Sequence, residues 1–524
     1  MPSTRCVIII FLVHLYSVSY GADILAILPT PSYSHQIPFR PLWKALAARG
    51  HNITLVTSDP ERNASIKNIK EIDISYGYEY IDKYKCIELA CNDSVSLIDV
   101  GRAIRLATAD INERFLKSPE GQNLIHNKDN HFDLLIVEAL LIDMMAFSWK
   151  YKIPFIGVSS LDCSTQFHDS AGNPTHPVVN PDPNLEIQDL NDMSFGERLA
   201  SFLFSATYKL LVYYLTYRKE YAMLQKYFGD DLPRLFDIQN EISMLFVATN
   251  PVFHNVRALM PNTITIGNGM HISSPKPLPK DIEEWLNSSK EDVVYFSLGS
   301  NIKGSILNDS TKAELTKAFS SLPYKVLWKI DHQVNDLPEN VLIKKWLPQQ
   351  DILRHPKVKV FITQGGLQSM QESIYFDKPM IGIPFFGDQH MNVKRMTHLG
   401  YGVKVHKNNI TRESISEAVI EVITNPIYRE KAEIYGNIFR DTDIPNVDKA
   451  VWWTEYTLRH NGTRQFRNPA LDMPFWKYWM LDVLGIVFGV LFIFSYLSLK
   501  FVKLILRRIF RRNGKQIDKS KKWN

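Results

Sequence analysis

The chain has 524 residues, of which 45% are apolar and 12% aromatic. One hydrophobic core rarely organises that many residues, so we expect two domains with additional segments. Sixty basic and fifty-five acidic residues give a formal net charge of +5, but ten of the basic residues lie between Lys500 and Asn524. The remainder is slightly acidic, which excludes a general surface for nucleic acids.

The first 21 residues have the three parts of a secretory signal peptide. Arg5 precedes an apolar run, Cys6–Val18, and the small residues Ser19 and Gly21 stand before Ala22. The run is too short to span a bilayer, so we expect cleavage before Ala22 and entry into the secretory pathway. A buried first strand or a retained anchor is the alternative.

Residues 480–500 form a second apolar run near the other end of the chain. Val483–Leu499 carries no charge and follows several aromatic residues. With the residues beside it, this stretch reaches about 30 Å, the thickness of a bilayer core. Basic flanks stay cytoplasmic, so we expect 501–524 to be a cytoplasmic tail and 22–477 to be lumenal. The terminal Lys-Lys-Trp-Asn of 521–524 resembles the dilysine retrieval signal of endoplasmic-reticulum membrane proteins.

Sequons for N-glycosylation and three cysteines lie on the predicted lumenal side. The sequons begin at Asn52, Asn63, Asn92, Asn287, Asn308, Asn409 and Asn461. Once Cys6 is lost with the signal peptide, Cys86, Cys91 and Cys163 remain. Three thiols without repeated spacing argue against a disulfide framework or a metal site, and a single Cys86–Cys91 bridge stays open.

Strands and helices alternate through two predicted domains, 22–266 and 267–475. In the first we expect strand 23–29, helix 39–49, strand 52–57, strand 132–137, a helical stretch to 150 and strand 154–159. After a Gly-, Ser- and Pro-rich linker over 267–279 we expect strand 293–297, helix 311–320, strands 324–330, 341–345 and 358–363, helix 367–376 and strand 380–383. This alternation predicts an α/β protein with two Rossmann-like, doubly wound domains facing a cleft, and a ligand beyond the carboxyl ends of the strands.

The densest signal is WLPQQDILRHPKVKVFITQGGLQSMQESIYFDKPMIGIPFFGDQHMN, over 346–392. In it a buried strand ends at Thr363, and Gly365-Gly366 leads into a helix that begins at about Leu367. Backbone N–H groups of such a turn and the positive end of the helix suit a diphosphate. By itself this pattern is common and also serves as plain structural punctuation.

The segment resembles the signature of the UDP-glycosyltransferase family, whose members have the two-Rossmann-domain GT-B fold. The resemblance includes 23–57, 132–159, 293–300 and the C-terminal membrane helix, and it favours membrane-anchored, invertebrate-like members. It implies inverting transfer of a hexosyl group from a UDP-sugar, with UDP-glucose favoured, to a hydroxyl of a small lipophilic acceptor. It implies no cofactor and no metal, since backbone amides and helix dipoles can stabilise the leaving UDP.

The resemblance also assigns roles to residues on the nucleotide side. Trp346 would stack on uracil, Gln349 would contact the base and ribose, and Glu372 would accept from the ribose hydroxyls. Gln364 stands where many members have a histidine that donates to the diphosphate, and an amide N–H₂ can donate the same bond without titrating. The rest of the phosphate cradle would consist of Gly299, Ser300, Gly366 and Ser369.

Sugar and acceptor would meet further along the cleft. The resemblance implies that Asp388 and Gln389 hydrogen-bond the sugar hydroxyls, and paired polar groups of this kind suit a neutral hexose. UDP-glucuronic acid is the alternative donor, which a cation near Asp388 would favour. The acceptor pocket is expected within 159–227, which is rich in Phe, Tyr and Leu.

His35 occupies the loop where the family places its general base. It would take the proton of the acceptor hydroxyl as that oxygen attacks the anomeric carbon. The imidazolium then needs a carboxylate to orient it. Many relatives have an aspartate at the end of the strand over 132–137, where this chain has Glu138, with Asp143 about one and a half helical turns on. Both stay candidates.

Two other classes of protein have Rossmann-like domains of this kind. A non-catalytic lumenal binding protein of the same fold is the alternative, because fold alone does not give function. A Rossmann oxidoreductase is excluded, since no G-x-G-x-x-G turn follows the strand over 23–29. The sequence names neither the acceptor nor the oligomeric state, and self-association stays open.

Overall fold

The structure is a computed structural model that describes residues 21–520, except 141, 183, 184, 186, 188, 189, 191, 212–216, 289, 333, 335 and 336. The predicted signal peptide, apart from Gly21, therefore lies outside the described residues. The chain divides into two compact units, Met1–Arg467 and Asn468–Asn524.

The first sheet has seven parallel strands in the order β3-β2-β1-β4-β5-β6-β7. The strands are β1 (Asp23–Leu28), β2 (Asn52–Thr57), β3 (Ile69–Asp73), β4 (Leu134–Glu138), β5 (Phe155–Ser159), β6 (Met244–Val247) and β7 (Thr263–Thr265). Every residue of β4 and β5 is buried. Continuous apolar runs of this kind are typical of parallel strands covered on both faces.

The second sheet has six parallel strands in the order β10-β9-β8-β11-β12-β13. They are β8 (Val293–Ser297), β9 (Lys325–Lys329), β10 (Val341–Lys344), β11 (Val358–Thr363), β12 (Met380–Gly382) and β13 (Gly402–Lys404). Two parallel α/β sheets confirm the predicted fold class.

Helices cover both sheets. In the first domain they are α2 (Tyr33–Gln36), α3 (Arg40–Ala48), α4 (Gly77–Lys83), α5 (Cys86–Cys91), α6 (Leu97–Lys117), α7 (Pro119–His126), α8 (Ala146–Tyr151), α9 (Thr165–Ser170), α10 (Phe195–Leu211), α11 (Tyr217–Phe228) and α12 (Leu235–Gln239). In the second they are α13 (Lys280–Asn287), α14 (Asp309–Ser321), α15 (Gln349–Arg354), α16 (Leu367–Tyr375), α17 (Asp388–Leu399), α18 (Arg412–Thr424), α19 (Pro426–Arg440) and α20 (Asn446–Arg459). The turn after α3 needs Gly50, whose φ of 92° is unfavourable for other residues.

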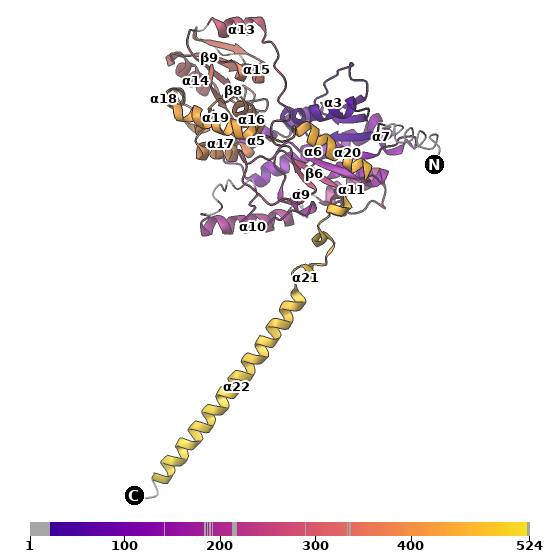
Figure 1. The fold of residues 1–524 in the computed structure, drawn as a ribbon, viewed down its shortest axis with the longest axis vertical. Coiled ribbons are helices and arrows are strands. Elements are labelled where there is room, and N and C mark those ends of the chain that lie inside the picture. The colour runs from indigo at the N-terminus through magenta and orange to yellow at the C-terminus, as the bar shows by residue number, and fades with distance from the viewer. Residues whose placement is uncertain are drawn as a thin grey trace, which may run out of the picture. The chain divides into compact units, whose positions relative to one another are not determined.

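Helix α20 follows the second sheet in sequence but packs on the first domain. Its Ala450 and Val451 join the core that contains Leu42 of α3, and Figure 1 shows α20 among the elements of the first domain. An Arg49–Glu455 ion pair of 3.1 Å lies at the rim of this contact. The predicted second domain, 267–475, thus contains a helix whose apolar face is buried by the other domain.

The C-terminal unit contains α21 (Phe475–Tyr478) and α22 (Leu481–Ser520). Within α22, Leu481–Phe510 is a predominantly apolar stretch of 30 residues. Its most apolar part has a mean hydropathy of 2.1, and no residue of that part is buried. By length and composition this stretch fits a single membrane span, in agreement with the run predicted over 480–500.

The three cysteines within the described residues are free thiols. Cys86 and Cys91 begin and end α5, and Cys163 is buried elsewhere. Side chains five positions apart point to different sides of a helix: Cys86 packs against Ala103 and Ala107 of α6, whereas Cys91 packs against the core of the second domain. The Cys86–Cys91 bridge that the sequence left open is therefore not formed.

Candidate functional site

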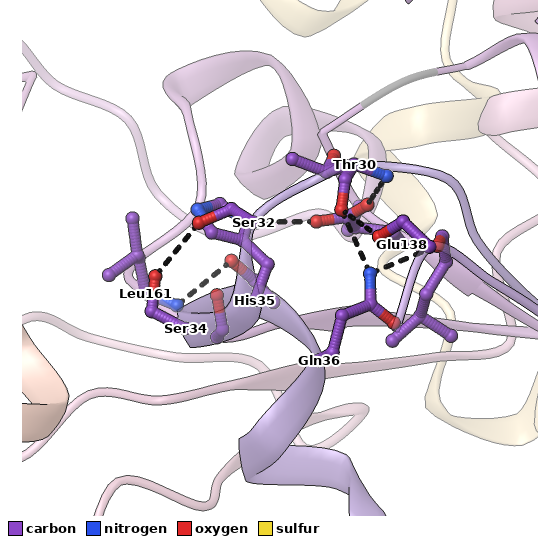
Figure 2. Close-up of polar contacts among 12 residues, drawn as sticks. Thr30, Ser32, Ser34, His35, Gln36, Glu138 and Leu161 are labelled. Atoms are coloured by element: carbon purple, nitrogen blue, oxygen red, sulfur yellow. Dashed lines mark hydrogen bonds and ion pairs between the residues drawn. The ribbon is translucent and has the colours of Figure 1, made fainter. Parts of the chain in front are cut away.

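His35 and Glu138 meet where β1 and β4 end. Nδ1 of His35 lies 2.9 Å from Oε1 of Glu138, and Oε2 of the same carboxylate accepts the N–H of Thr30 at 3.1 Å (Figure 2). Glu138 is buried and His35 is partly exposed. Because an ionised carboxylate can only accept, Nδ1 carries the hydrogen, which leaves the Nε2 lone pair to take a proton.

His35 lies in the short helix α2 and not in the loop that the sequence predicted, and a buried glutamine at the end of this helix ties it to the chain after β1. Nε2 of Gln36 donates to the carbonyl oxygens of Leu28 and Thr30, at 3.0 and 2.9 Å, and its Oε1 accepts from the Thr57 hydroxyl at 2.8 Å. The Ser58 hydroxyl also donates to the Thr30 carbonyl. Sequence analysis missed Gln36, because nothing in its spacing distinguishes it from a surface residue.

Asp143, the other candidate partner, lies in a separate buried cluster. Its Oδ2 accepts from Asn112 at 2.9 Å, and the neighbouring Glu220 pairs with Arg105 at 2.5 Å. Burial raises the pKa of Asp143. Burial and the charge of Asp143 together raise the pKa of Glu220 to about 9, against the lowering effect of Arg105. The structure thus brings Glu138 to His35 and places Asp143 among α6 and α11.

Trp346 lies in the loop before α15 and is exposed. Tyr33, two residues before His35, meets its ring edge to face with centroids 5.5 Å apart. Nζ of Lys329 lies 5.2 Å from the Trp346 ring centre. An exposed indole offers a flat surface on which a base can stack.

Gln349 and Glu372 are bonded to each other. Nε2 of Gln349 donates to Oε2 of Glu372 at 2.7 Å and to the Ser369 hydroxyl at 3.0 Å. Its Oε1 accepts from the Tyr295 hydroxyl at 3.1 Å. The residues predicted to contact base and ribose, Gln349 and Glu372, therefore form one connected group on α15 and α16.

Two further residues lie against the Glu372 carboxylate. Nε2 of Gln350 donates to its Oε1 at 3.0 Å, and Nε2 of His271 lies 3.1 Å from the same oxygen. The His271 carbonyl accepts from Gln350 at 3.2 Å, so the interdomain linker is tied to this group. Sequence analysis missed both residues, although Gln350 lies inside the motif.

The turns at Gly299 and Gly365 have no room for a larger side chain at either glycine. Gly299 has a φ of 72°, and a Cβ there would lie 2.4 Å from Nε2 of Gln364. Gly365 has a φ of 86°, and Gly366 caps the N-terminus of α16. Ser300 follows in the first turn and is half-buried. Oε1 of Gln364 is buried without a hydrogen-bond partner among the described residues, so a polar group could still be accommodated beside it.

Asp388 and Gln389 open α17. Nδ2 of Asn392 donates to Oδ2 of Asp388 at 2.7 Å and to the Gly365 carbonyl at 3.0 Å, which links these residues to the Gly365-Gly366 turn. Oε1 of Gln389 accepts the N–H of Phe385 at 2.9 Å. Burial raises the pKa of Asp388, while the Asn392 hydrogen bond and the charge of protonated His35 oppose this rise.

The chain after α5 contacts the second domain through an ion pair. Nζ of Lys407 lies 2.6 Å from Oδ1 of Asp93 and donates to the Phe385 carbonyl at 3.2 Å. Asn408 donates to the other Asp93 oxygen at 3.0 Å. The side chain of Lys407 is only 7% exposed, and its contact with Phe385 lies next to the hydrogen bond that fixes Gln389. Sequence analysis missed this pair, whose members lie far apart in the chain.

A cavity of about 630 Å³ lies beside that ion pair. Its wall consists of Glu88, Cys91, Asn92, Asp93, Ser94, Ser305, Ile306 and Asn408. None of these residues belongs to the region 159–227 in which the acceptor pocket was predicted, and that pocket stays a prediction. Over the described part of the chain no group of three or more His, Cys, Asp or Glu side chains could hold a metal ion.

Similarity to known proteins extends over nearly the whole chain. The family model described as UDP-glucoronosyl and UDP-glucosyl transferase matches residues 24–516. UDP-glucosyltransferase 2 of Dactylopius coccus is 32% identical over 486 residues, which cover 92% of each protein. The ecdysteroid UDP-glucosyltransferase of Lymantria dispar multicapsid nuclear polyhedrosis virus is 30% identical, with 91% of this chain and 95% of that protein covered. UDP-glucuronosyltransferase 2A3 of Mus musculus is 26% identical, with both chains covered in full.

Two solved structures share the fold. The glycotransferase of kitacinnamycin superposes with a TM-score of 0.57 at 18% identity, over 84% of this chain and 99% of that one. The calicheamicin glycosyltransferase CalG4 superposes with a TM-score of 0.52 at 17% identity, with the same coverage. The two parallel sheets are therefore arranged as in GT-B glycosyltransferases.

Proposed function

Because the chain belongs to the UDP-glucoronosyl and UDP-glucosyl transferase family and is a UDP-glycosyltransferase, we propose that it transfers glucose from UDP-glucose to a hydroxyl of a small lipophilic acceptor. Transfer proceeds with inversion, in a single displacement. The observation that best supports this chemistry is the 2.9 Å contact between His35 and Glu138.

His35 acts as the general base. Its Nε2 takes the proton of the acceptor hydroxyl while that oxygen forms a bond to the anomeric carbon and the bond from that carbon to the UDP oxygen breaks. The buried Glu138 carboxylate holds the imidazole and stabilises its protonated form. Asp388 and Gln389 orient the sugar beside this base.

UDP leaves toward the second domain. Its diphosphate lies at the Gly365-Gly366 turn and the first turn of α16, where backbone N–H groups stabilise the developing negative charge. Gln364 donates to the diphosphate. Trp346 stacks on the uracil, and Glu372 accepts from the ribose.

Glucose is preferred over glucuronic acid as the transferred sugar. Lys407 reaches the loop before Asp388, but Asp93 already pairs with it. A sugar carboxylate would therefore gain little from it, whereas the polar groups of Asp388 and Gln389 suit hydroxyls. Relatives named as glucosyltransferases support this preference, and the mouse glucuronosyltransferase keeps UDP-glucuronic acid as the alternative.

We further propose that α22 anchors the enzyme in the endoplasmic-reticulum membrane. Both α/β domains then lie in the lumen and 501–524 forms the cytoplasmic tail, because basic flanks stay cytoplasmic. Protease added to sealed microsomes should remove only this tail.

The activity is tested with membranes that contain the full chain. UDP-glucose, UDP-glucuronic acid, UDP-galactose and UDP-N-acetylglucosamine are each offered with a panel of phenols and lipophilic alcohols, and products are identified by mass. We expect glucosides, with the anomeric configuration inverted relative to the donor when measured by NMR. Retention of configuration, or exclusive use of another UDP-sugar, would contradict the proposal.

A further inference from the structure

A half-buried lysine of the second sheet lies beside two parts of the predicted donor site. Lys329 is the last residue of β9 and pairs with Ser297 of β8, so it stands at the carboxyl end of the sheet, where open α/β sheets bind ligands. Its Nζ donates to the carbonyl oxygen of Gly299 at 2.5 Å and lies 5.2 Å from the centre of the Trp346 ring. The ammonium group therefore lies between the side chain expected to stack on uracil and a residue expected to hold the diphosphate.

The Lys329 ammonium group forms no ion pair with any carboxylate in the described part of the chain. Burial lowers the pKa of Lys329, and the charge of Asp331 opposes this change, but Oδ1 of Asp331 accepts the N–H of Gly304 at 2.6 Å. An ammonium group has three donors, and the Gly299 carbonyl takes one of them. Because a partly desolvated charge without a counterion is costly, an anion beside Nζ would stabilise this arrangement.

The residues predicted to hold the diphosphate carry no positive charge of their own. They are Gly299, Ser300, Gln364, Gly366 and Ser369. Gln364 is an uncharged amide, and a Cβ on Gly299 would lie 2.4 Å from its Nε2, so the carbonyl group that Lys329 contacts belongs to a residue packed against Gln364. A diphosphate is strongly anionic at neutral pH, and lysine binds phosphate groups as a point charge. Lys329 can supply the charge that these five residues lack.

We propose that the ammonium group of Lys329 binds the phosphate next to the ribose of UDP. Its place between Trp346 and Gly299 corresponds to the part of UDP between the uracil and the far end of the diphosphate. One N–H of the ammonium group holds the Gly299 carbonyl, and the other two donate to phosphate oxygens. This inference rests on the proposed UDP-sugar site, and it adds to that site a charged ligand for the phosphate.

Calorimetry on the full chain in detergent micelles tests this assignment with UDP, UMP and uridine. Uridine, which has no phosphate, is measured by competition against UDP. The variants are Lys329→Met, Lys329→Gln and Lys329→Arg, and Lys325→Met is the matched control. Lys325 begins the same strand, its Nζ lies 4.9 Å from the centre of the Trp285 ring, and it donates to the Trp285 carbonyl at 3.4 Å. It therefore makes the same two kinds of contact at the opposite end of β9.

We expect Lys329→Met to weaken the binding of UDP and of UMP by about ten- to a hundredfold, the usual effect of losing a hydrogen bond to a charged group. The affinity for uridine should stay the same, because uridine offers no phosphate to the ammonium group. Lys329→Arg keeps the positive charge and should restore most of the affinity for UDP. Lys325→Met should bind all three ligands as the wild type does.

Equal weakening of UDP, UMP and uridine would overturn the proposal, because Lys329 would then act only by supporting Trp346. Weaker binding of UDP with unchanged binding of UMP would also overturn it and would place the ammonium group at the second phosphate. Lys329→Gln repeats the measurement if the thermal midpoint shows that Lys329→Met is unfolded, and unchanged UDP affinity in the folded variant would overturn the proposal as well. A wild-type chain that does not bind UDP would overturn the proposed function itself, and this inference with it.

Discussion

His35 of the first domain interacts electrostatically with Asp388 of the second domain. Burial raises the pKa of Asp388, and the charge of protonated His35 opposes that rise. The two domains also meet where Tyr33 contacts the Trp346 ring edge to face. Burial chiefly raises the pKa of Tyr33, and the charge of Glu372 adds to this rise. Helix α2 therefore faces the residues expected to hold both sugar and nucleotide. Base and donor can act on one acceptor hydroxyl only in such an arrangement.

His35→Ala should lower kcat by about 10²–10⁴, the usual contribution of a positioned general base. The affinity for UDP, measured by calorimetry, should change little, since the expected nucleotide contacts lie in the second domain. His131→Ala, which removes an exposed histidine of the same domain, is the matched control and should keep full activity. Full activity of the His35 variant on a phenol acceptor would refute the mechanism.

Glu138→Gln and Asp143→Asn separate the two candidate partners of the base. Each change keeps shape and removes charge. Because only Glu138 contacts His35, Glu138→Gln should lower kcat by about 10²-fold or more without raising KM for the donor. Asp143→Asn should leave kcat within a few-fold of the wild type and alter the thermal midpoint instead. A larger loss of kcat in the Asp143 variant would reverse the assignment.

The long strands were predictable because their apolar runs are continuous. The bounds of β2, β8 and β11 were predicted to the residue. Four strands were not predicted: β3 (Ile69–Asp73), β6 (Met244–Val247), β7 (Thr263–Thr265) and β13 (Gly402–Lys404). β3 has the sequence IKEID, in which charged residues interrupt the apolar ones. Runs of three or four residues are too short to show a period, and only their pairing with longer neighbours makes them strands.

The partner of His35 could not be chosen from sequence because the choice depends on register. β1 pairs with β4 through Ile27 and Val137, so the end of β4 lies beside the loop after β1 and Glu138 reaches His35. Five residues further on, the chain has turned away. Gln36 and Lys407 escaped prediction for a related reason, since their partners are set by tertiary packing and no spacing in the chain indicates them.

Trp346→Ala should raise KM for the UDP-sugar roughly tenfold or more, because stacking a base on an aromatic ring contributes roughly 1–3 kcal/mol. Acceptor binding should change little. Trp346→Phe should restore most of the affinity, and Trp452→Ala, at an exposed tryptophan of α20, should have no effect on donor KM. An unchanged donor KM in the Trp346→Ala variant would place the nucleotide elsewhere.

Glu220→Gln should make stability less dependent on pH. Burial and the charge of Asp143 raise the pKa of Glu220 to about 9 in the folded state, above its unfolded value of roughly 4.3. The proton is therefore held more tightly when folded, and its stabilising contribution is present at low pH and lost as pH rises toward 9. The thermal midpoint of the wild type should fall relative to the variant between about pH 5 and pH 9. Glu417→Gln, at an exposed glutamate, is the control, and a difference that does not vary with pH would refute the assignment.

Lys407→Met should weaken binding of the sugar but not of the nucleotide. The change removes the pair with Asp93 and the donor to the Phe385 carbonyl, while keeping most of the buried aliphatic stem. The loop that orients Gln389 then loses one of its supports, so KM for UDP-glucose should rise several-fold while the inhibition constant of UDP stays constant. Lys303→Met breaks another ion pair between the domains, Lys303–Asp82 at 3.1 Å, but that pair is exposed and should contribute little. If Lys407→Met and Lys303→Met changed KM for UDP-glucose and the inhibition constant of UDP equally, the proposal would be wrong. Lys407 would then contribute only to contact between the domains and would not support the loop before Asp388.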